Sequence, residues 1–564
     1  MNPPRAVRVV TDVTTLDREF DYLVPEAMGT LEVGALVRVD LHNRRVRAWV
    51  VAEAEPNADL KPILAGRGLG PPPDLVELSD WAAQRWVSTR VRFLRAASPP
   101  RIVRDLPTPP NGPDVGGSLT IVPPAGVVEV APTTDPLDLV LAVYRATRRA
   151  GASLLVLVPT DGRSRRLRGR LERRGIPTAS GEEWERARAG WPVVVGTRGA
   201  AFAPIEHLAG AVVVDADDDG YVSTAAPTWN ALEVVRERAR RGGVPWWATA
   251  SVLDPVLWAA TTSRVDRLAQ GWPEIEVVDR RRADPHDGVL SRAALDAAHR
   301  ALAGNEPIAV TVLHPRLGRG RLLACATCGE LQRCAVCGLA EREVGASLQC
   351  DDAHEPRERF CRSCGATRVR AVRSGVTTLA RDVAAQLGQP VSEVTSQTAP
   401  DGPLARVVVG TESLWGRVRR TALVVVADFD EYLLAPRATA RCDALRALAR
   451  AGRLVGGRAE GRGRIIVQTR RGDDPVVVAA QRGDLRAVRE EDALVARDLG
   501  LAPYGATARL HGDGVAEFVG ALDASRVRVR FDGDRAEVHA PDVATLVATL
   551  RAHPRPPGLR VAVE

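Results

Sequence analysis

Two groups of residues in this 564-residue chain have the types and spacing to do chemistry, an aspartate cluster and a cysteine cluster. The aspartates end the stretch "AGAVVVDADDDGYVS" at 209–223, where an apolar run leads directly into Asp215, Asp217 and Asp218. Carboxylates after a buried strand can hold the metal ion of a nucleotide-hydrolysing site. Aspartates at strand ends are also often solvent-exposed helix caps. Whether the chain has a phosphate-binding loop therefore decides between a metal site and a cap.

The cysteines have the spacing of zinc ligands. Seven of the eight fall within 325–364, in the pattern Cys325-x2-Cys328, Cys334-x2-Cys337, Cys350-x3-His354 and Cys361-x2-Cys364. Two thiolates two residues apart fill half of a tetrahedral zinc shell, so four pairs predict two Zn²⁺ ions per chain. We assign Cys334, Cys337, Cys350 and His354 to one ion; the alternative is a surface histidine beside a three-cysteine site that water completes. Spacing alone leaves nested and cross-braced pairing of the motifs open.

The composition is normal for a soluble protein, and the charge permits a polyanionic partner without requiring one. The net charge is +7 and the pI near 9.2, and 76 of the 77 basic residues are arginine, Lys61 being the only lysine. No apolar run approaches the roughly 20 residues of a membrane span, and the N-terminus lacks the apolar core of a secretory signal. We therefore expect a cytoplasmic protein without a membrane partner.

The order of apolar segments predicts several domains. Residues 5–100 begin with short alternating segments typical of a β-rich unit, and 105–117 has the composition of a linker. Beyond it, two sets of continuous Val/Leu runs alternate with helices, which favours parallel strands buried on both faces. The cysteines interrupt the second set. The predicted units are an N-terminal DNA-binding domain, a linker, a first lobe, a second lobe with its zinc insertion, and a C-terminal domain, at 1–104, 105–118, 119–285, 286–483 (insertion 324–368) and 484–564.

Several motifs, in their order and spacing, resemble the PriA family of replication restart proteins over most of the chain. They are "REFDYLVP" (18–25), "EVGALVRV", "NRRVRAWVV", "VVVGTRGAAFAPIEHLAGAVVVDADDDGY", the cysteine pairs, "GTESLWG", "DFDEYLL", "RALARAGR" and "GRIIVQT". The resemblance implies an α/β fold with two RecA-like helicase lobes, an N-terminal β-rich DNA-binding domain, a two-zinc insertion in lobe 2 and a small α+β C-terminal domain. It also implies nested zinc pairing, with Cys325, Cys328, Cys361 and Cys364 as the first site.

The resemblance implies a pocket for the 3′ end of a nascent leading strand in the N-terminal domain. Phe20, Asp21 and Tyr22 would form part of it, with Gly34 allowing close approach. An aromatic face can stack on a terminal base, and a carboxylate can accept from a base edge or a 3′-hydroxyl. The phosphate contacts would come from Arg38, Arg44, Arg45, Arg47 and Lys61. The alternative is that Phe20 and Tyr22 pack a β-rich core.

The ATPase motifs of the family are degraded in this chain. A P-loop needs glycines, a lysine and a Ser/Thr. Its position, between "GVVEVA" and "PLDLVLAVYRATRRAG", reads "APTTDP" (131–136), where Asp135 would repel phosphate and Pro136 lacks an amide donor. Ala216 replaces the second acid of the aspartate motif, and Arg446 and Ala449 replace a glutamine and a glycine of the arginine-finger stretch. Asp215, Arg450 and Arg453 are then remnants of a catalytic site, and ATP binding is doubtful.

The sequence thus favours a restart protein that binds abandoned or stalled forks and promotes primosome assembly and reloading of the replicative helicase, without helicase activity of its own. Its partners would be forked DNA with a leading-strand 3′ end, primosome proteins, the replicative helicase or its loader, and single-strand DNA-binding protein. One alternative is an active ATP-dependent 3′-5′ helicase with divergent motifs. Another is a zinc-ribbon scaffold that binds protein partners.

Overall fold

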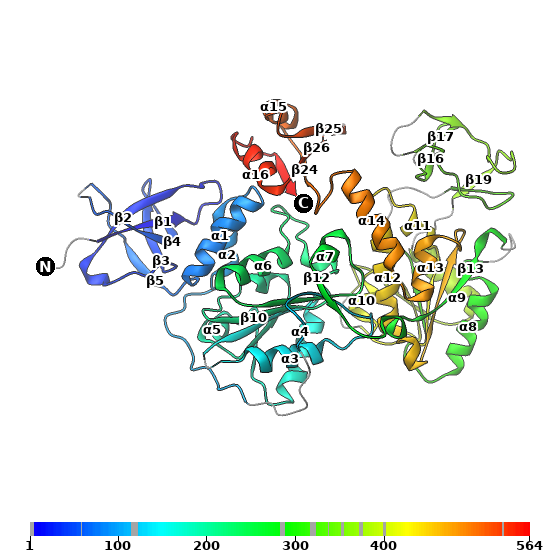
Figure 1. Ribbon diagram of the computed structural model, residues 1–564, viewed down its shortest axis with the longest axis horizontal. Coiled ribbons are helices and arrows are strands. Elements are labelled where there is room, and N and C mark those ends of the chain that lie inside the picture. The colour runs from blue at the N-terminus through cyan, green and yellow to red at the C-terminus, as the bar shows by residue number, and fades with distance from the viewer. Residues whose placement is uncertain are drawn as a thin grey trace.

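A computed structural model of the chain describes residues 5–57, 59–113, 122–149, 151–282, 288–315, 323–336, 338–350, 355–371, 376–398, 402–532 and 535–564. Figure 1 shows two α/β lobes side by side along the long axis, with the N-terminal unit at one end. The C-terminal unit lies above the first lobe, and a small unit that carries the cysteines lies above the second.

The N-terminal unit is an antiparallel five-stranded sheet with two helices. Its strand order is β2-β1-β4-β3-β5. Alternating apolar residues such as Val7 and Val9 on β1 bury one face of the sheet. The elements are β1 (Arg5–Thr11), β2 (Glu19–Val24), β3 (Leu36–Leu41), β4 (Arg44–Ala54), β5 (Ala65–Gly68), α1 (Pro73–Arg85) and α2 (Arg90–Ala97).

The first lobe is a seven-stranded sheet, in the order β12-β6-β11-β10-β7-β9-β8, whose neighbouring strands all run parallel. Helices cover both faces, so alternate residues of β10 enter two different cores, Ala211 and Val213 on one side and Val212 on the other. Its strands are β6 (Gly126–Glu129), β7 (Ser153–Leu157), β8 (Thr178–Ser180), β9 (Val193–Gly196), β10 (Leu208–Val213), β11 (Trp246–Ala250) and β12 (Thr261–Arg264). Its helices are α3 (Pro136–Thr147), α4 (Asp161–Glu172), α5 (Trp184–Ala189), α6 (Ala231–Gly242) and α7 (Pro255–Ala259).

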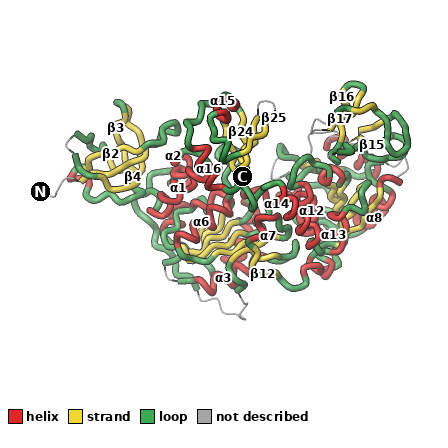
Figure 2. Tube along the Cα trace, turned by 45° about the horizontal axis from the view of Figure 1, so that its top comes forward, coloured by secondary structure: helices red, strands yellow, loops and turns green. Residues whose placement is uncertain are grey.

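The second lobe repeats this architecture with six parallel strands in the order β13-β23-β22-β14-β21-β20. Figure 2 shows the strands of the first lobe as a ladder flanked by helices, with α12 and α13 of the second lobe beside it. The strands are β13 (Glu274–Asp279), β14 (Val310–Leu313), β20 (Val391–Val394), β21 (Val407–Gly410), β22 (Leu423–Val426) and β23 (Arg464–Thr469). The helices are α8 (Arg292–Ala303), α9 (Val376–Leu387), α10 (Leu414–Arg417), α11 (Asp430–Leu433), α12 (Ala440–Val455), α13 (Pro475–Arg482) and α14 (Arg486–Asp498).

The cysteine unit is inserted between β14 and α9 and consists of short antiparallel strands. These are β15 (Leu323–Cys325), β16 (Glu341–Val344), β17 (Ser347–Cys350), β18 (Arg357–Glu358) and β19 (Val369–Ala371). The unit has a small apolar cluster, in which Ala324 and Leu331 pack with Leu434, the residue after α11 of the second lobe. So small a core needs another source of stability, such as a bound metal.

The C-terminal unit is an antiparallel sheet, β25-β26-β24-β27, with two helices. Its contacts reach the N-terminal unit, because Arg551 on α16 donates to the carbonyl oxygen of Ala83 on α1. The elements are β24 (Ala506–His511), α15 (Val515–Gly520), β25 (Arg528–Asp532), β26 (Arg535–Ala540), α16 (Val543–Arg551) and β27 (Arg560–Val563).

A chain of aromatic rings joins the N-terminal unit to the first lobe. Trp86 packs on Phe93, Phe93 on Phe202, and Phe202 edge-on against Trp229, with ring centroids 5.3–6.1 Å apart. Alongside it, Arg85 of α1 forms a two-pronged ion pair with Glu233 of α6. The α/β class with two tandem parallel lobes, predicted from the sequence, is confirmed. Within the described residues, no helix combines the length and apolar character that crossing a membrane requires.

Candidate functional site

The segment in the P-loop position carries its own anion. Asp135 ends the segment and caps α3, its Oδ1 accepting from the backbone N–H of Leu137 at 3.0 Å. Arg170 of α4 donates to both carboxylate oxygens, at 2.8 and 2.5 Å. Burial opposes ionisation of Asp135, but the bonds from Arg170 and Leu137 outweigh it and lower its pKa. The helix end that would receive a phosphate is therefore filled by a carboxylate of the chain itself.

The loop residues before Asp135 are hydrogen-bonded to the second lobe and to the segment that precedes that lobe. Arg453 on α12 donates through Nε to the carbonyl oxygen of Pro132 at 3.0 Å. Thr133 donates through its hydroxyl to the carbonyl oxygen of Gly271 at 3.1 Å. The Thr133 hydroxyl, a donor that a phosphate-binding loop would offer to its ligand, is therefore used within the chain.

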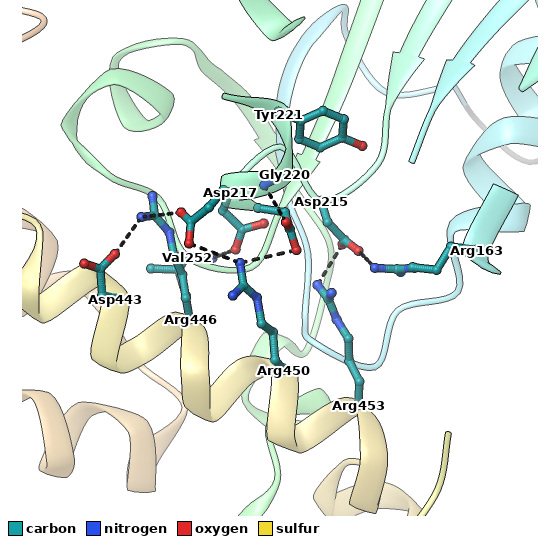
Figure 3. Close-up of polar contacts among 12 residues, drawn as sticks. Arg163, Asp215, Asp217, Gly220, Tyr221, Val252, Asp443, Arg446, Arg450 and Arg453 are labelled. Atoms are coloured by element: carbon teal, nitrogen blue, oxygen red, sulfur yellow. Dashed lines mark hydrogen bonds and ion pairs between the residues drawn. The ribbon is translucent and has the colours of Figure 1, made fainter. Parts of the chain in front are cut away.

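Asp215 lies just beyond β10 and is bound by two arginines from two lobes (Figure 3). Arg163 of α4 donates to its Oδ2, and Arg453 donates to its Oδ1 at 2.7 Å. The side chain is only 5% exposed, and its backbone has a left-handed φ of 55°. Burial raises the pKa of Asp215, but the charges of Arg453 and Arg163 more than offset this and hold it below the ordinary value. Both carboxylate oxygens thus already have cationic partners.

Asp217 has a different environment from Asp215. It is 7% exposed, and its Oδ2 accepts from the backbone N–H of Val252 at 3.1 Å. Its pKa is raised, because burial and the negative charge of Asp215 together outweigh the nearby arginines. The pKa values of the two acids are therefore shifted in opposite directions, that of Asp215 downward and that of Asp217 upward.

The arginines of α12 form a row that faces the aspartates of the first lobe (Figure 3). Arg446, Arg450 and Arg453 are spaced by four and three residues, which places them on one face of the helix. Arg446 pairs with Asp254, the cap of α7, at 2.9 Å, and with Asp443 on its own helix at 3.1 Å. Arg450 pairs with Asp218 at 3.2 Å. We call these three arginines with Asp215, Asp218 and Asp254 the interlobe latch. It joins the two lobes without a ligand.

The proposed 3′-end residues are not all on one face of the N-terminal sheet. Tyr22 is 4% exposed, packs in the sheet core and donates to the carbonyl oxygen of Asp40 at 2.8 Å. Phe20, two residues earlier on the same face, is partly buried, and the guanidinium of Arg18 lies 5.2 Å from its ring centroid. Asp21 lies between them and forms a two-pronged bond with Arg8, at 2.9 and 3.2 Å. The alternation of the strand therefore separates Asp21 from the two rings.

The basic candidates cluster around the β3–β4 hairpin. His42 and Asn43 form its turn, both with positive φ, and Arg44 and Arg45 follow them with exposed side chains. Three further candidates, Arg38, Arg47 and Lys61, lie along the same part of the sheet. Arg47 is paired with Asp12 and Lys61 with Asp40, both at 2.8 Å. A Cβ on Gly34 would lie 1.8 Å from the carbonyl oxygen of Pro71, so close backbone packing explains this glycine.

Four thiols converge in the cysteine unit. The sulfur atoms of Cys325, Cys328, Cys361 and Cys364 all lie within 4.8 Å of one another. Four thiolates at this spacing suit a tetrahedral zinc ion, so the group can hold a metal. The set joins the first and last cysteine pairs, which is the nested arrangement.

Only half of the second predicted zinc set is described. Cys334 and Cys350 are buried, while Cys337 and His354 lie outside the described residues. The turn at Cys334 repeats the turn at Cys325: Gly338 and Gly329, both with positive φ, each donate to the carbonyl oxygen of the first cysteine at 3.0 Å. In both turns, the backbone N–H two residues after that cysteine lies 3.4 Å from its sulfur. A glycine after each Cys-x2-Cys pair is a signal of these turns that the cysteine spacing alone did not use.

Comparisons with known proteins identify the N-terminal unit and the family of the chain. The family model described as "3'DNA-binding domain (3'BD)" of PriA matches residues 8–99, from β1 to α2. A "Probable replication restart protein PriA" of Mycobacterium leprae is 28% identical over 87% of this chain and 85% of its own length. The chain belongs to the PriA family. A PriA of Mycobacterium bovis is 30% identical over 67% of this chain and 66% of its own length, and PriA of Thermotoga maritima is 24% identical over 57% and 46%.

As a PriA family member, the chain is a replication restart protein with an N-terminal DNA-binding domain. Solved structures of the helicases Dbp5 from Saccharomyces cerevisiae, "bound to RNA and ADP BeF3", and Mss116, "bound to ssRNA and UDP-BeF", match 67% and 62% of this chain. The matches cover 90% and 67% of those chains, at 10% and 9% identity and TM-scores of 0.37 and 0.36.

Proposed function

We propose that this PriA family protein recognises stalled or abandoned replication forks and serves as a platform for primosome assembly and helicase reloading, without hydrolysing ATP. The proposed absence of ATP hydrolysis rests on one observation: side chains occupy the positions in the cleft where the phosphates and the metal ion would bind. Asp135, neutralised by Arg170, caps the helix in the P-loop position. Asp215, the remnant of the metal-binding acid, is held by Arg163 and Arg453. A triphosphate with its Mg²⁺ would have to break these ion pairs, of which those of Asp215 are largely buried and that of Asp135 is partly exposed.

DNA recognition is assigned to the N-terminal unit, which the 3′ DNA-binding model covers. Phe20 is only partly buried, so its exposed ring edge can contact a terminal base, while the buried Tyr22 supports it from the core. Arg44 and Arg45 at the hairpin tip, together with Arg38, Arg47 and Lys61, would contact phosphates. Asp21 and Gly34 complete the proposed site, Asp21 from the opposite face through its partner Arg8.

The cysteine unit is assigned a structural role and the contacts to primosome partners. We propose two zinc ions, one bound by Cys325, Cys328, Cys361 and Cys364, the other by Cys334, Cys337, Cys350 and His354. The similar turns at Cys325 and Cys334 support the second site. The protein partners would be the replicative helicase or its loader and single-strand DNA-binding protein. We propose the division given from the sequence, at 1–104, 105–118 (linker), 119–285, 286–483 and 484–564. It needs two changes, because β13 pairs with β23 in the sheet of the second lobe and α14 packs into the core of that lobe.

Fork binding tests the DNA half of this proposal. The full-length, zinc-loaded protein is titrated with a fork that carries a leading-strand 3′ end and with one that lacks this strand. Tighter binding to the first fork is expected, and Phe20→Ala combined with Asp21→Ala should remove the preference. Equal affinity of this double variant and the parent protein for the first fork would overturn the pocket assignment.

A further inference from the structure

The C-terminal sheet has one edge strand whose apolar side chains are not covered. In the strand order β25-β26-β24-β27, the two edges are β25 and β27. Val529 and Phe531 of β25 lie opposite Val538 and Ala536 of β26, so they point to the same face of the sheet as these two buried residues. Yet Val529 is 36% exposed and Phe531 is 54% exposed, whereas the valines of β27 on the other edge are each 3% exposed.

The position of the two helices explains this difference between the edges. Apolar residues of α15 and α16 pack into one core with the inward-facing residues of β24, β26 and β27. Val527, just before β25, still belongs to this core, but Val529 and Phe531 do not. Apolar side chains that no helix covers, on an edge strand, are a typical contact surface for another chain.

The backbone of β25 is open along the same edge. Its one strand partner is β26, in a regular register without a bulge, and within the described residues no backbone hydrogen bond joins it to any other segment. Proteins commonly protect such an edge with a proline, a bulge or a covering loop. The sequence "RVRVRFD" at 526–532 contains no proline. A second strand can therefore add to this edge through backbone hydrogen bonds.

The sequence of β25 is complementary to itself in antiparallel pairing. In a two-fold symmetric pair of strands centred on Arg530, residue 528 of each copy lies opposite residue 532 of the other, and 529 lies opposite 531. Arg528 then faces an aspartate, and Val529 faces Phe531. The valines and phenylalanines of both copies meet on one face at the junction of the two strands, where they cover each other from water.

Arg530 is the residue of the strand that meets its own copy in this register. Like charges directly opposite each other destabilise a strand pair. Glu537 of β26 lies opposite Arg530 on the other side, so two carboxylates flank the two guanidinium groups and offset their repulsion. Figures 1 and 2 show β25 on the side of the C-terminal unit that faces away from the N-terminal unit. Pairing through β25 therefore leaves the N-terminal sheet uncovered.

We propose that β25 pairs with β25 of a second copy of this chain, antiparallel and centred on Arg530. The protein then forms a two-fold symmetric dimer in which two four-stranded sheets join into one. A contact made by one short strand from each copy is at the small end of protein interfaces, so the dimer is reversible at concentrations on the order of micromolar. This dimer goes beyond the proposed fork recognition and does not depend on it.

Sedimentation equilibrium of the full-length, zinc-loaded protein, free of DNA, tests the proposal. The mean mass should rise from the 60.5 kDa of one chain toward twice this value as the concentration increases from about 1 to about 100 µM. Arg528→Asp or Asp532→Arg alone should weaken the dimer by about tenfold or more, because each change places like charges opposite each other in both symmetric pairs. Arg560→Asp, at the exposed first residue of β27 on the other edge, is the matched control and should leave the dimer unchanged.

An equimolar mixture of the two single variants separates a lost contact from a damaged fold. In a mixed pair, each changed residue faces the opposite charge again, so the mixture should dimerise as the parent protein does. Three results would each overturn the proposal: a parent protein that stays at the mass of one chain, a dimer that Arg528→Asp leaves unchanged, or a mixture no heavier than its components. A parent protein that stays monomeric while Arg528→Asp weakens fork binding would also overturn it, in favour of a DNA contact at this edge.

Discussion

Arg453 and Asp215, 238 positions apart in the sequence, meet across the cleft with Nη2 and Oδ1 2.7 Å apart. In an ATPase of this architecture, a nucleotide brings an arginine finger and a metal-binding acid together from opposite sides. Here the two side chains contact each other directly. The two lobes are therefore joined by a direct ion pair between side chains.

This pair should contribute measurably to stability. Asp215→Asn or Arg453→Met alone should lower the stability of the lobes by about 3 kcal/mol, because each change leaves a buried charge without its partner. The double variant should lose less than the sum of the two. A double-mutant cycle by denaturant unfolding measures the coupling, and a coupling energy near zero would contradict the latch.

Asp217 should behave in the opposite way to Asp215 as pH changes. Its pKa is raised in the folded protein, so ionisation of Asp217 destabilises the fold once the pH passes the unfolded value, about 4. Asp217→Asn should therefore raise the melting temperature at neutral pH and leave it unchanged below pH about 4. Asp215→Asn, in the same scans, should destabilise at neutral pH, with the difference from the parent shrinking as acid protonates Asp215. If the melting temperatures of both variants depended on pH in the same way, the opposite pKa shifts of Asp215 and Asp217 would be ruled out.

Two substitutions of Asp135, the cap of α3, should lower the stability by different amounts. Asp135→Ala removes both the helix cap and the partner of Arg170, and it should cost about 1 kcal/mol or more. Asp135→Asn keeps a side-chain acceptor for Leu137 N–H but loses the charge, so its loss should be smaller. Thermal unfolding compares the two. Equal losses would mean that the Arg170 pair, and not the cap, determines the stability of this segment.

Zinc content tests the cysteine assignment. Metal analysis of dialysed protein should give two zinc ions per chain, and Cys361→Ser should remove one of them. His354→Ala should loosen only the other ion. Chelation should unfold the insertion while the lobes keep their melting transition, since the lobes have separate large cores. A single tightly held ion in the parent protein would refute the second site.

The hairpin arginines should contribute to fork binding through phosphate. Replacing both Arg44 and Arg45 with glutamine should weaken fork affinity and reduce the slope of log K against log salt by about 1–2, one counterion per lost contact. Arg300→Gln, at an exposed arginine of α8, is the charge-matched control. An unchanged slope in the hairpin variant would place the phosphate contacts elsewhere.

Much of the fold follows from local sequence patterns. Continuous apolar runs such as those ending at Val213 and Val426 are buried on both faces, so they predicted parallel strands without tertiary information. Strand alternation also separates Asp21 from Phe20 and Tyr22, and the pattern "EFDYLV" is enough to infer this separation. The row of arginines on α12 is likewise evident from its spacing of four and three residues.

The sequence alone does not identify which charged side chains pair with one another. That Arg453 reaches Asp215, or Arg170 reaches Asp135, depends on how helices and lobes pack over long separations. Asp215 was predicted as the remnant of a metal ligand, yet the guanidinium groups that replace the metal are known only from the three-dimensional arrangement.

The most direct test of the account is ATP hydrolysis by purified, zinc-loaded protein in the presence of forked DNA that it demonstrably binds. We expect tight fork binding with phosphate release no faster than in a protein-free control, and the same result for Asp215→Asn. Turnover that the fork stimulates and that Asp215→Asn abolishes would contradict it.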